Sequence, residues 1–166
     1  VIRTKRGLDL PISGSPEQNI DNGRSVRSVG LVGFDYPGLK PTMEVVVGDH
    51  VKTGQVLFTD KKTPGVKYTA PGCGIIAAIN RGARRVFQSI VIQLEGDEAE
   101  SFPVVPLEKL SREVAVNILV ESGQWTSLRT RPFSKVPVPS QSPNSIFVTA
   151  VDSRPHAPNP EIVIAE

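Results

Sequence analysis

Three arginines crowd one short stretch of the chain, and cations held so close together could bind an anion. Arg81, Arg84 and Arg85 lie in the string Asn-Arg-Gly-Ala-Arg-Arg. Guanidinium groups pair well with carboxylates and phosphates, so the cluster is a candidate docking point for an acidic surface or a phosphate group. A solvent-facing hairpin tip is the commoner explanation for such a cluster, and the sequence leaves both open.

The other reactive side chains do not form a recognisable catalytic or metal site. Cys73 is the single cysteine, so this chain alone cannot form an internal disulfide, a thiolate zinc cage or an iron–sulfur cluster. No His or Lys lies within a few residues to activate it, and we expect it to be structural. Neither His50 nor His156 has a Glu or Cys at ligand spacing, so no metal site is predicted.

Composition and charge exclude several classes of protein. The 166 residues carry 19 basic and 17 acidic side chains, a balance far from that of a nucleic-acid-binding protein. No apolar run approaches the roughly 20 residues that a membrane span needs. Walker, Gly-x-Gly-x-x-Gly and Gly-x-Ser-x-Gly motifs are absent. The chain starts without methionine and ends on the strand-like run 161–166, so we expect a fragment of a longer cytoplasmic protein without catalytic activity of its own.

The stretch Met43–Phe58 organises the first part of the chain. A β-branched run leads to Gly48, Val51 follows as an apolar anchor, and Gly54 opens a second apolar run. Glycine adopts the positive φ angles that tight turns require. Two short strands joined by a glycine-punctuated turn are therefore predicted.

About seven short strands, separated by Gly, Pro and Asn, are predicted up to Asp97. Val26–Phe34 and Val86–Leu94 are the clearest, and the second alternates apolar residues on one face at a period of two. We assign residues 1–101 to a small all-β domain with a lead-in over residues 1–25.

The composition changes after this point, and residues 102–166 are predicted to begin an α/β domain. A helix should start after Ser111 as N-cap and end before Gly123. Apolar residues fall at helical spacing along this stretch: Leu107, Leu110, Val114 and Ile118. The wholly apolar run Ile146–Ala150 is typical of a strand buried on both faces of a parallel sheet.

The Gly-Asp-x-Val turn at 48–51, followed by Gly-x-x-Leu at 54–57, resembles the hallmark of biotinyl/lipoyl-type barrel-sandwich domains. A longer set of strings resembles the A-subunit of the sodium-translocating NADH:quinone reductase. They include Gly7-Leu-Asp-Leu-Pro-Ile, Pro16-Glu-Gln, Gly48-Asp-x-Val-Lys-x-Gly-Gln-Val-Leu-Phe, Asp60-Lys-Lys-x-Pro-Gly-Val, Ile79-Asn-Arg-Gly and Arg129-Thr-Arg-Pro-Phe-Ser-Lys-Val. Because so many unrelated strings agree in order, the resemblance is specific.

This resemblance implies a peripheral subunit on the cytoplasmic side of the bacterial inner membrane. The complex passes electrons from NADH to ubiquinone while pumping sodium ions. The implied fold is a biotinyl-like barrel-sandwich domain followed by the start of a Rossmann-like domain. Other subunits are the implied partners and hold the flavins, the iron–sulfur cluster and the NADH site. This fragment would bind none of these cofactors, and would dock in the complex in association with quinone.

The stretch around Arg129 and Arg131 is then a candidate quinone site. The two arginines point to the same side if the chain is extended, and Trp125 and Phe133 lie nearby. An aromatic and cationic wall of this kind could line a pocket for a quinone head group. The alternative is that these residues pack an irregular loop against the helix.

Two other functions stay open. A lipoyl or biotinyl carrier attaches its cofactor to a lysine at a hairpin tip, where Lys61 and Lys62 lie. The flanking residues differ from both carrier motifs, and the position counted back from Pro71 falls near Thr63, so we expect an unmodified, solvated turn. The last alternative is an enzyme whose Rossmann-like part binds flavin or NADH itself.

Overall fold

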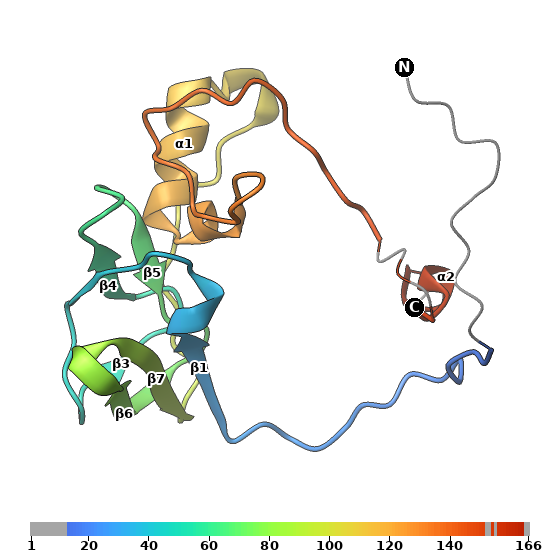
Figure 1. Cartoon of the computed structure of the whole chain (residues 1–166), viewed down its shortest axis with the longest axis horizontal. Helices are drawn as coiled ribbons and strands as arrows, with labels where there is room; N and C mark the ends of the chain where they lie inside the picture. Colours follow the sequence, from blue (N-terminus) through green and yellow to red (C-terminus); the bar gives the residue numbers. More distant parts are fainter. Residues whose placement is uncertain (1–12, 152–153, 155, 165–166) are drawn as a thin grey trace. The chain divides into compact units, whose positions relative to one another are not determined.

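A computed structural model of the chain describes residues 13–151, 154 and 156–164 (Figure 1). Residues 1–12 of the predicted lead-in lie outside this range. The chain divides into two compact units, Ser25–Ser142 and the paired end segments Val1–Arg24 with Pro143–Glu166.

Two antiparallel sheets build the first unit. One has the strand order β1-β7-β6-β3, from β1 (Ser28–Val32), β7 (Phe87–Leu94), β6 (Gly74–Arg81) and β3 (His50–Val51). The other has the order β2-β4-β5, from β2 (Pro41–Met43), β4 (Val56–Asp60) and β5 (Lys67–Thr69). The predicted set of about seven short strands is confirmed for the described residues.

The predicted turn glycines are confirmed, whereas the strand before them is shorter than expected. Gly48 has a φ of 97° and Gly54 a φ of 86°. The run after Met43 is not a strand, because the Asp49 carboxylate accepts a hydrogen bond from the Val46 amide at 2.8 Å and folds residues 46–49 into a turn. A side chain that competes for backbone groups has ended the strand early.

Side chains from both sheets fill one hydrophobic core, as in a sandwich. The fully buried members are Val51, Leu57, Phe58, Val66, Ile76, Ile90 and Ile92. An aromatic cluster lies among them, in which Phe58 stacks on Tyr68 with ring centroids 4.7 Å apart and meets Phe87 at 5.2 Å. This core fixes the positions of the hairpins and loops described below.

Helix α1 (Arg112–Glu121) confirms the predicted caps but buries a different face. The Ser111 hydroxyl accepts a hydrogen bond from the Val114 amide, and Gly123 has a φ of 78°. Leu107 is 82% exposed because it precedes the helix, in the 3-10 turn η3 (Leu107–Lys109). The residues that pack on the core are instead Val116, Leu119 and Val120.

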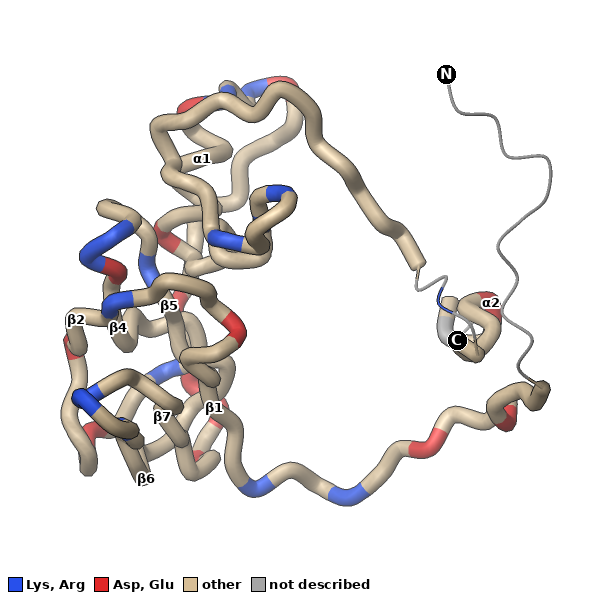
Figure 2. The backbone as a smooth tube through the Cα atoms, viewed as in Figure 1, with Lys and Arg blue, Asp and Glu red and all other residues tan. Residues whose placement is uncertain are grey.

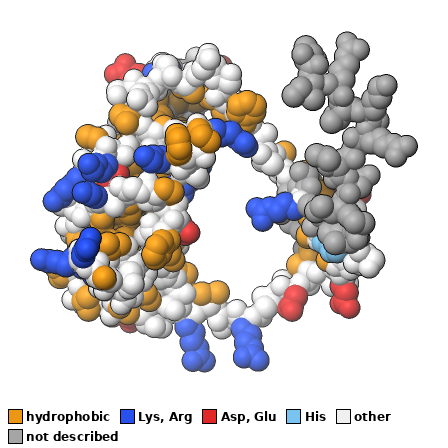
Figure 3. Space-filling model, viewed as in Figure 1, with side chains coloured by type: hydrophobic (Ala, Val, Ile, Leu, Met, Phe, Trp, Pro, Cys, Tyr) orange, Lys and Arg blue, Asp and Glu red, His pale blue; other side chains and the backbone are white. Residues whose placement is uncertain are grey.

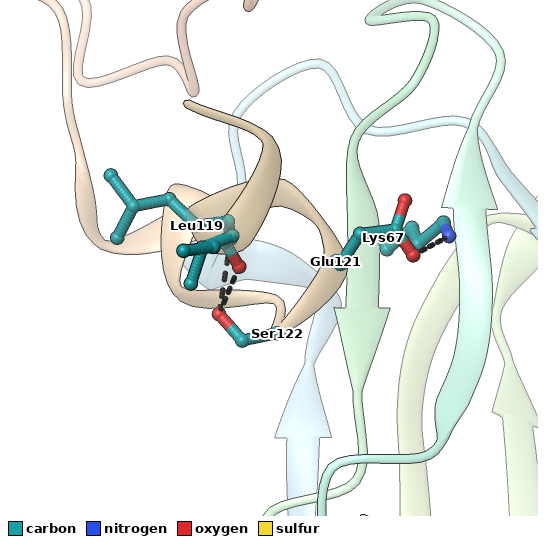
Figure 4. Close-up of polar contacts among 5 residues, drawn as sticks. Lys67, Leu119, Glu121 and Ser122 are labelled. Atoms are coloured by element: carbon teal, nitrogen blue, oxygen red, sulfur yellow. Dashed lines mark hydrogen bonds and ion pairs between the residues drawn. The ribbon is translucent and has the colours of Figure 1, made fainter. Parts of the chain in front are cut away.

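The C-terminal end of α1 is attached to strand β5 by polar contacts (Figure 4). Lys67 forms an ion pair with Glu121, and the Thr69 hydroxyl donates a hydrogen bond to the Ser122 carbonyl at 3.2 Å. Gly123 lies so near Thr69 that a Cβ atom there would come within 2.3 Å of Oγ1. The helix therefore belongs to the same compact unit as the sandwich.

Short turns complete the unit: η1 (Gly33–Asp35) and η4 (Gln124–Ser127) are 3-10 turns, and η2 (Ala83–Arg85) is a turn with non-helical backbone angles at Arg84. Trp125 in η4 is buried, and its indole nitrogen donates a hydrogen bond to the Pro137 carbonyl at 2.8 Å. This bond holds the loop after α1 against the core.

Two predictions for the end segments are wrong. The run Ile146–Ala150 is not a strand and is exposed, with Val148 at 87%, because the described residues provide no neighbouring strands to cover it. The run after Asn159 begins a helix, α2 (Pro160–Ile164), since the Asn159 side chain accepts a hydrogen bond from the Glu161 amide and Pro160 occupies the first turn. No helix among the described residues is long and apolar enough to cross a membrane.

Candidate functional site

The hairpin between β6 and β7 presents the three clustered arginines at its tip, which we call the arginine tip (Arg81, Arg84 and Arg85). All three side chains are exposed, so the predicted solvent-facing hairpin tip is confirmed. The turn is closed by a hydrogen bond from the Val86 amide to the Ala83 carbonyl at 3.2 Å. Its two central residues, Arg84 and Arg85, both have positive φ angles, 54° and 61°.

The arginine tip has no acidic partner among the described residues. The ion pairs recorded within the described part of the chain join Lys52 to Glu98 and Lys67 to Glu121. Arg81 donates a hydrogen bond to the Arg85 carbonyl at 3.4 Å. Figure 3 shows two groups of Lys and Arg side chains at the left edge of the unit Ser25–Ser142, with others spread over the same face.

The residues predicted to form a cationic and aromatic wall do not all face the same way. Arg129 is exposed and places its guanidinium carbon 4.6 Å from the centre of the Tyr36 ring. Arg131 is also exposed, and Phe133 is 71% exposed. Trp125 instead points into the core, where it packs the loop as the alternative interpretation expected.

A cavity of about 490 Å³ lies beside this loop, between residues 36–39, the β4–β5 hairpin and residues 130–138. Its apolar walls include Leu39 and Val136. Its polar walls include Asp60, Lys62, Thr63, Tyr68 and Lys135. Arg129, Arg131 and Phe133 are not among its lining residues, so the structure offers a neighbouring pocket that the sequence did not reveal.

Tyr68, Asp60 and Thr63 are buried residues with polar groups that line this cavity. Asp60 Oδ1 accepts hydrogen bonds from the Lys40 amide at 2.9 Å and the Lys62 amide at 3.0 Å, which fixes the hairpin. Burial, and secondarily the nearby charge of Asp60, raise the pKa of Tyr68 above its ordinary value of 10.0. The Tyr68 hydroxyl therefore keeps its proton and is available as a hydrogen-bond donor.

Lys61 and Lys62 lie at the exposed turn of the β4–β5 hairpin, as predicted. Thr63, the position that aligns with the carrier lysine by counting, is 9% exposed and has no amine. We expect protein co-expressed with a lipoyl or biotinyl ligase to remain unmodified, because the attachment position holds no lysine. Intact-mass measurement checks this, with an authentic carrier domain as the positive control. A mass increase mapped to Lys61 or Lys62 would contradict it.

The fold brings His50 to the single cysteine. Strand β3 pairs with β6, so that His50 Nε2 comes 3.9 Å from Cys73 Sγ across 23 positions of sequence. Local spacing could not have shown this contact. Cys73 is 3% exposed, and no group of three or more His, Cys, Asp or Glu in the described part of the chain could hold a metal ion.

Two small antiparallel sheets around one core, with a hairpin where carriers attach their cofactor, define a barrel-sandwich domain of the biotinyl/lipoyl class. Residues 2–95 match the family described as the NqrA N-terminal barrel-sandwich hybrid domain, and residues 110–166 match the NqrA second alpha/beta domain. The chain belongs to the NqrA family, the A-subunits of Na(+)-translocating NADH-quinone reductases. The expected fold class is thus confirmed.

Named relatives agree with this assignment over the whole chain. The Na(+)-translocating NADH-quinone reductase A-subunit of Pseudomonas aeruginosa PAO1 is 62% identical over 169 residues. The proteins of the same name from Saccharophagus degradans and Hahella chejuensis are 60% and 58% identical over the same length. All three alignments cover 100% of this chain, and the chain spans 38% of the length of each relative.

Proposed function

We propose that this chain is the docking and quinone-associated part of the NqrA protein in a sodium-pumping NADH:quinone reductase. The observation that carries the proposal is the ordered match of two NqrA domains, over residues 2–95 and 110–166. The protein is peripheral, on the cytoplasmic side of the membrane. Its partners are the other subunits, which hold the flavins, the iron–sulfur cluster and the NADH site.

The compact unit Ser25–Ser142 suits a docking role because it is rigidly built. Its sandwich core is fully packed around Phe58, and α1 is attached to β5 through Lys67 and Thr69. A surface that changes little on binding loses little conformational entropy when it meets a partner. The chain thus supplies shape and support, and redox chemistry takes place on its partners.

We place the quinone head group in the cavity lined by Tyr36, Leu39 and Lys135. A quinone offers two carbonyl oxygens as hydrogen-bond acceptors between flat apolar faces. The Tyr68 hydroxyl and the amines of Lys62 and Lys135 are donors on the cavity wall, and Leu39 and Val136 supply apolar surface. The cavity wall thus offers a head group both hydrogen-bond donors and some apolar surface.

We propose a supporting role for the residues that the sequence suggested as a quinone site, Arg129, Arg131 and Phe133, because they do not line the cavity. They lie on the loop that borders it, and Arg129 covers the Tyr36 ring by a cation–π contact. Exposed Phe133 offers apolar surface to the tail of a quinone that enters the cavity. Arg129 and Arg131 are exposed on the same loop.

Photo-crosslinking in the assembled complex tests the quinone assignment. A photoreactive ubiquinone analogue should label peptides that contain residues 36–39 or 129–138, and excess ubiquinone should compete. Lys135→Ala with Tyr68→Phe should lower this labelling about tenfold, by removing two donors worth about 1.4 kcal/mol together. Lys109→Ala, an exposed lysine outside the cavity, is the control. Labelling confined to other subunits would remove the quinone assignment while leaving the docking role intact.

A further inference from the structure

We infer that the arginine tip is a docking surface for a carboxylate-rich patch on a partner protein. The inference rests on the proposed function, because it names the surface through which this protein meets another subunit. Three observations carry it: the backbone conformation of the tip, its unbalanced charge and the geometry of the arginine side chain.

The turn at the arginine tip is built from residues that do not suit it. A two-residue turn with positive φ at both central positions favours Asn-Gly, because other side chains are crowded there. Arg84 and Arg85 occupy these positions with φ angles of 54° and 61°. If this hairpin served only to connect β6 to β7, Asn-Gly in place of Arg84-Arg85 would make it more stable. Backbone strain in an exposed loop often occurs at a functional site. In this turn the strained residues are also the charged ones.

The charge of the arginine tip is not neutralised within the described chain. Residues 81–94 contain no Asp or Glu, and no described carboxylate forms an ion pair with the three guanidinium groups. The hydrogen bond from Arg81 to the Arg85 carbonyl keeps the first side chain along the tip. Figure 2 shows the basic tip at the outer end of the β6–β7 hairpin, with the other basic hairpin, β4–β5, on the same side in this view.

The side-chain chemistry favours fixed carboxylates over a lipid surface. Arginine presents a planar fork that binds a carboxylate through two parallel hydrogen bonds. Sequences that bind anionic lipid usually carry about four to eight basic residues beside a membrane-facing apolar segment. The tip has three arginines, fewer than such sequences carry, and the exposed Val86 follows them in the chain. A few directional donors on a rigid turn match a small acidic patch on a folded partner.

Charge reversal measures the docking directly. We expect the full-length protein with Arg84→Glu and Arg85→Glu to be retained on the remaining subunits at least about tenfold more weakly than wild type, since two charge-assisted contacts become repulsive. Arg24→Glu with Arg27→Glu is the matched control: both residues are exposed, the charge change is equal, and the loss should be less than about twofold. If the tip variant is retained as well as wild type, the inference about the arginine tip is wrong but the proposed function is unaffected. Failure of wild type to bind any of the other subunits overturns the proposed function as well.

A variant that removes the backbone strain of the turn shows whether the arginines serve docking or stability. Arg84→Asn with Arg85→Gly should raise the midpoint of thermal unfolding by about 4 °C or more, because this pair suits the turn. The same variant should lose retention on the complex. A more stable protein that docks as well as wild type would show that the arginines have no binding role. An unchanged midpoint would show that the turn is not strained, which removes the first observation and counts against the inference.

Crosslinking identifies the partner chemistry. Arg84→Lys with Arg85→Lys keeps both charges and adds amines that a zero-length carbodiimide couples to carboxylates in direct contact. A crosslink from position 84 or 85 to an Asp or Glu of another subunit supports the inference. Absence of such a crosslink, together with binding to phosphatidylglycerol vesicles that charge reversal abolishes, overturns it in favour of lipid.

Discussion

Phe58→Ala should remove about 3–5 kcal/mol from the free energy of unfolding, because truncation of a buried aromatic leaves a cavity that the core cannot close. Phe58 is fully buried and is the largest side chain in that state. Its ring contacts both Tyr68 at 4.7 Å and Phe87 at 5.2 Å, so the change also removes two aromatic pairs. These residues come from β4, β5 and β7, so one substitution weakens both sheets.

Urea unfolding followed by circular dichroism measures this loss. Phe34→Ala is the matched control, since the Phe34 side chain is 79% exposed and its truncation should change the stability by less than about 0.5 kcal/mol. A loss below about 1 kcal/mol for Phe58→Ala would contradict the core described here. Equal losses for the two variants would contradict it as well.

Gly123→Ala should cost about 2–4 kcal/mol, through two separate effects. Its φ of 78° disfavours a residue with a side chain. The added Cβ would also lie 2.3 Å from Thr69 Oγ1 and 3.0 Å from Thr69 Cβ, so either the helix end or strand β5 must move. Such a movement would lengthen the hydrogen bond from Thr69 to the Ser122 carbonyl.

Gly65→Ala distinguishes these two effects. Gly65 has a φ of 88°, close to that of Gly123, but a Cβ there would meet nothing within 4 Å. We expect it to cost only about 1 kcal/mol, the conformational part alone. The same chemical denaturation applies to both variants. If they lose equal stability, the contact between α1 and β5 contributes nothing.

The strand content and turn positions followed from the sequence because local residue types decide them. Gly48 and Gly54 were predicted to take positive φ angles and do so. Ser111 and Gly123 marked the ends of α1 for the same reason, since caps act within one helical turn. Val86–Leu94 alternated at a period of two and became β7 (Phe87–Leu94).

Features that depend on contacts between residues far apart in the sequence were predicted wrongly or not at all. The buried face of α1 is set by contact with the sandwich core, so it begins at Val116 and excludes Leu107. The apolar run Ile146–Ala150 looked like a buried strand because composition reports what a segment can bury and not whether neighbours are present. Asn159 caps α2 but follows a run of turn residues, so its local sequence does not distinguish a helix cap from another turn.

The candidate site was predicted only where its residues are neighbours in the sequence. Arg81, Arg84 and Arg85 share one turn, and the structure places them together. The cavity joins Tyr36, Lys62, Tyr68 and Lys135 from separate elements, so no spacing rule could assemble it. The contact of His50 with Cys73 depends likewise on pairing between β3 and β6.

The attachment of α1 to β5 has a consequence for how the two family domains separate. The first domain match ends at residue 95 and the second begins at residue 110, with the 96% exposed Val104 between them. A protease that cuts at this link would break the chain without releasing α1, since Val120, the Lys67–Glu121 pair and the Thr69 hydroxyl still hold it. Sandwich and helix would then melt as a single cooperative block. The gap between the two family matches, residues 96–109, thus lies inside the compact unit Ser25–Ser142.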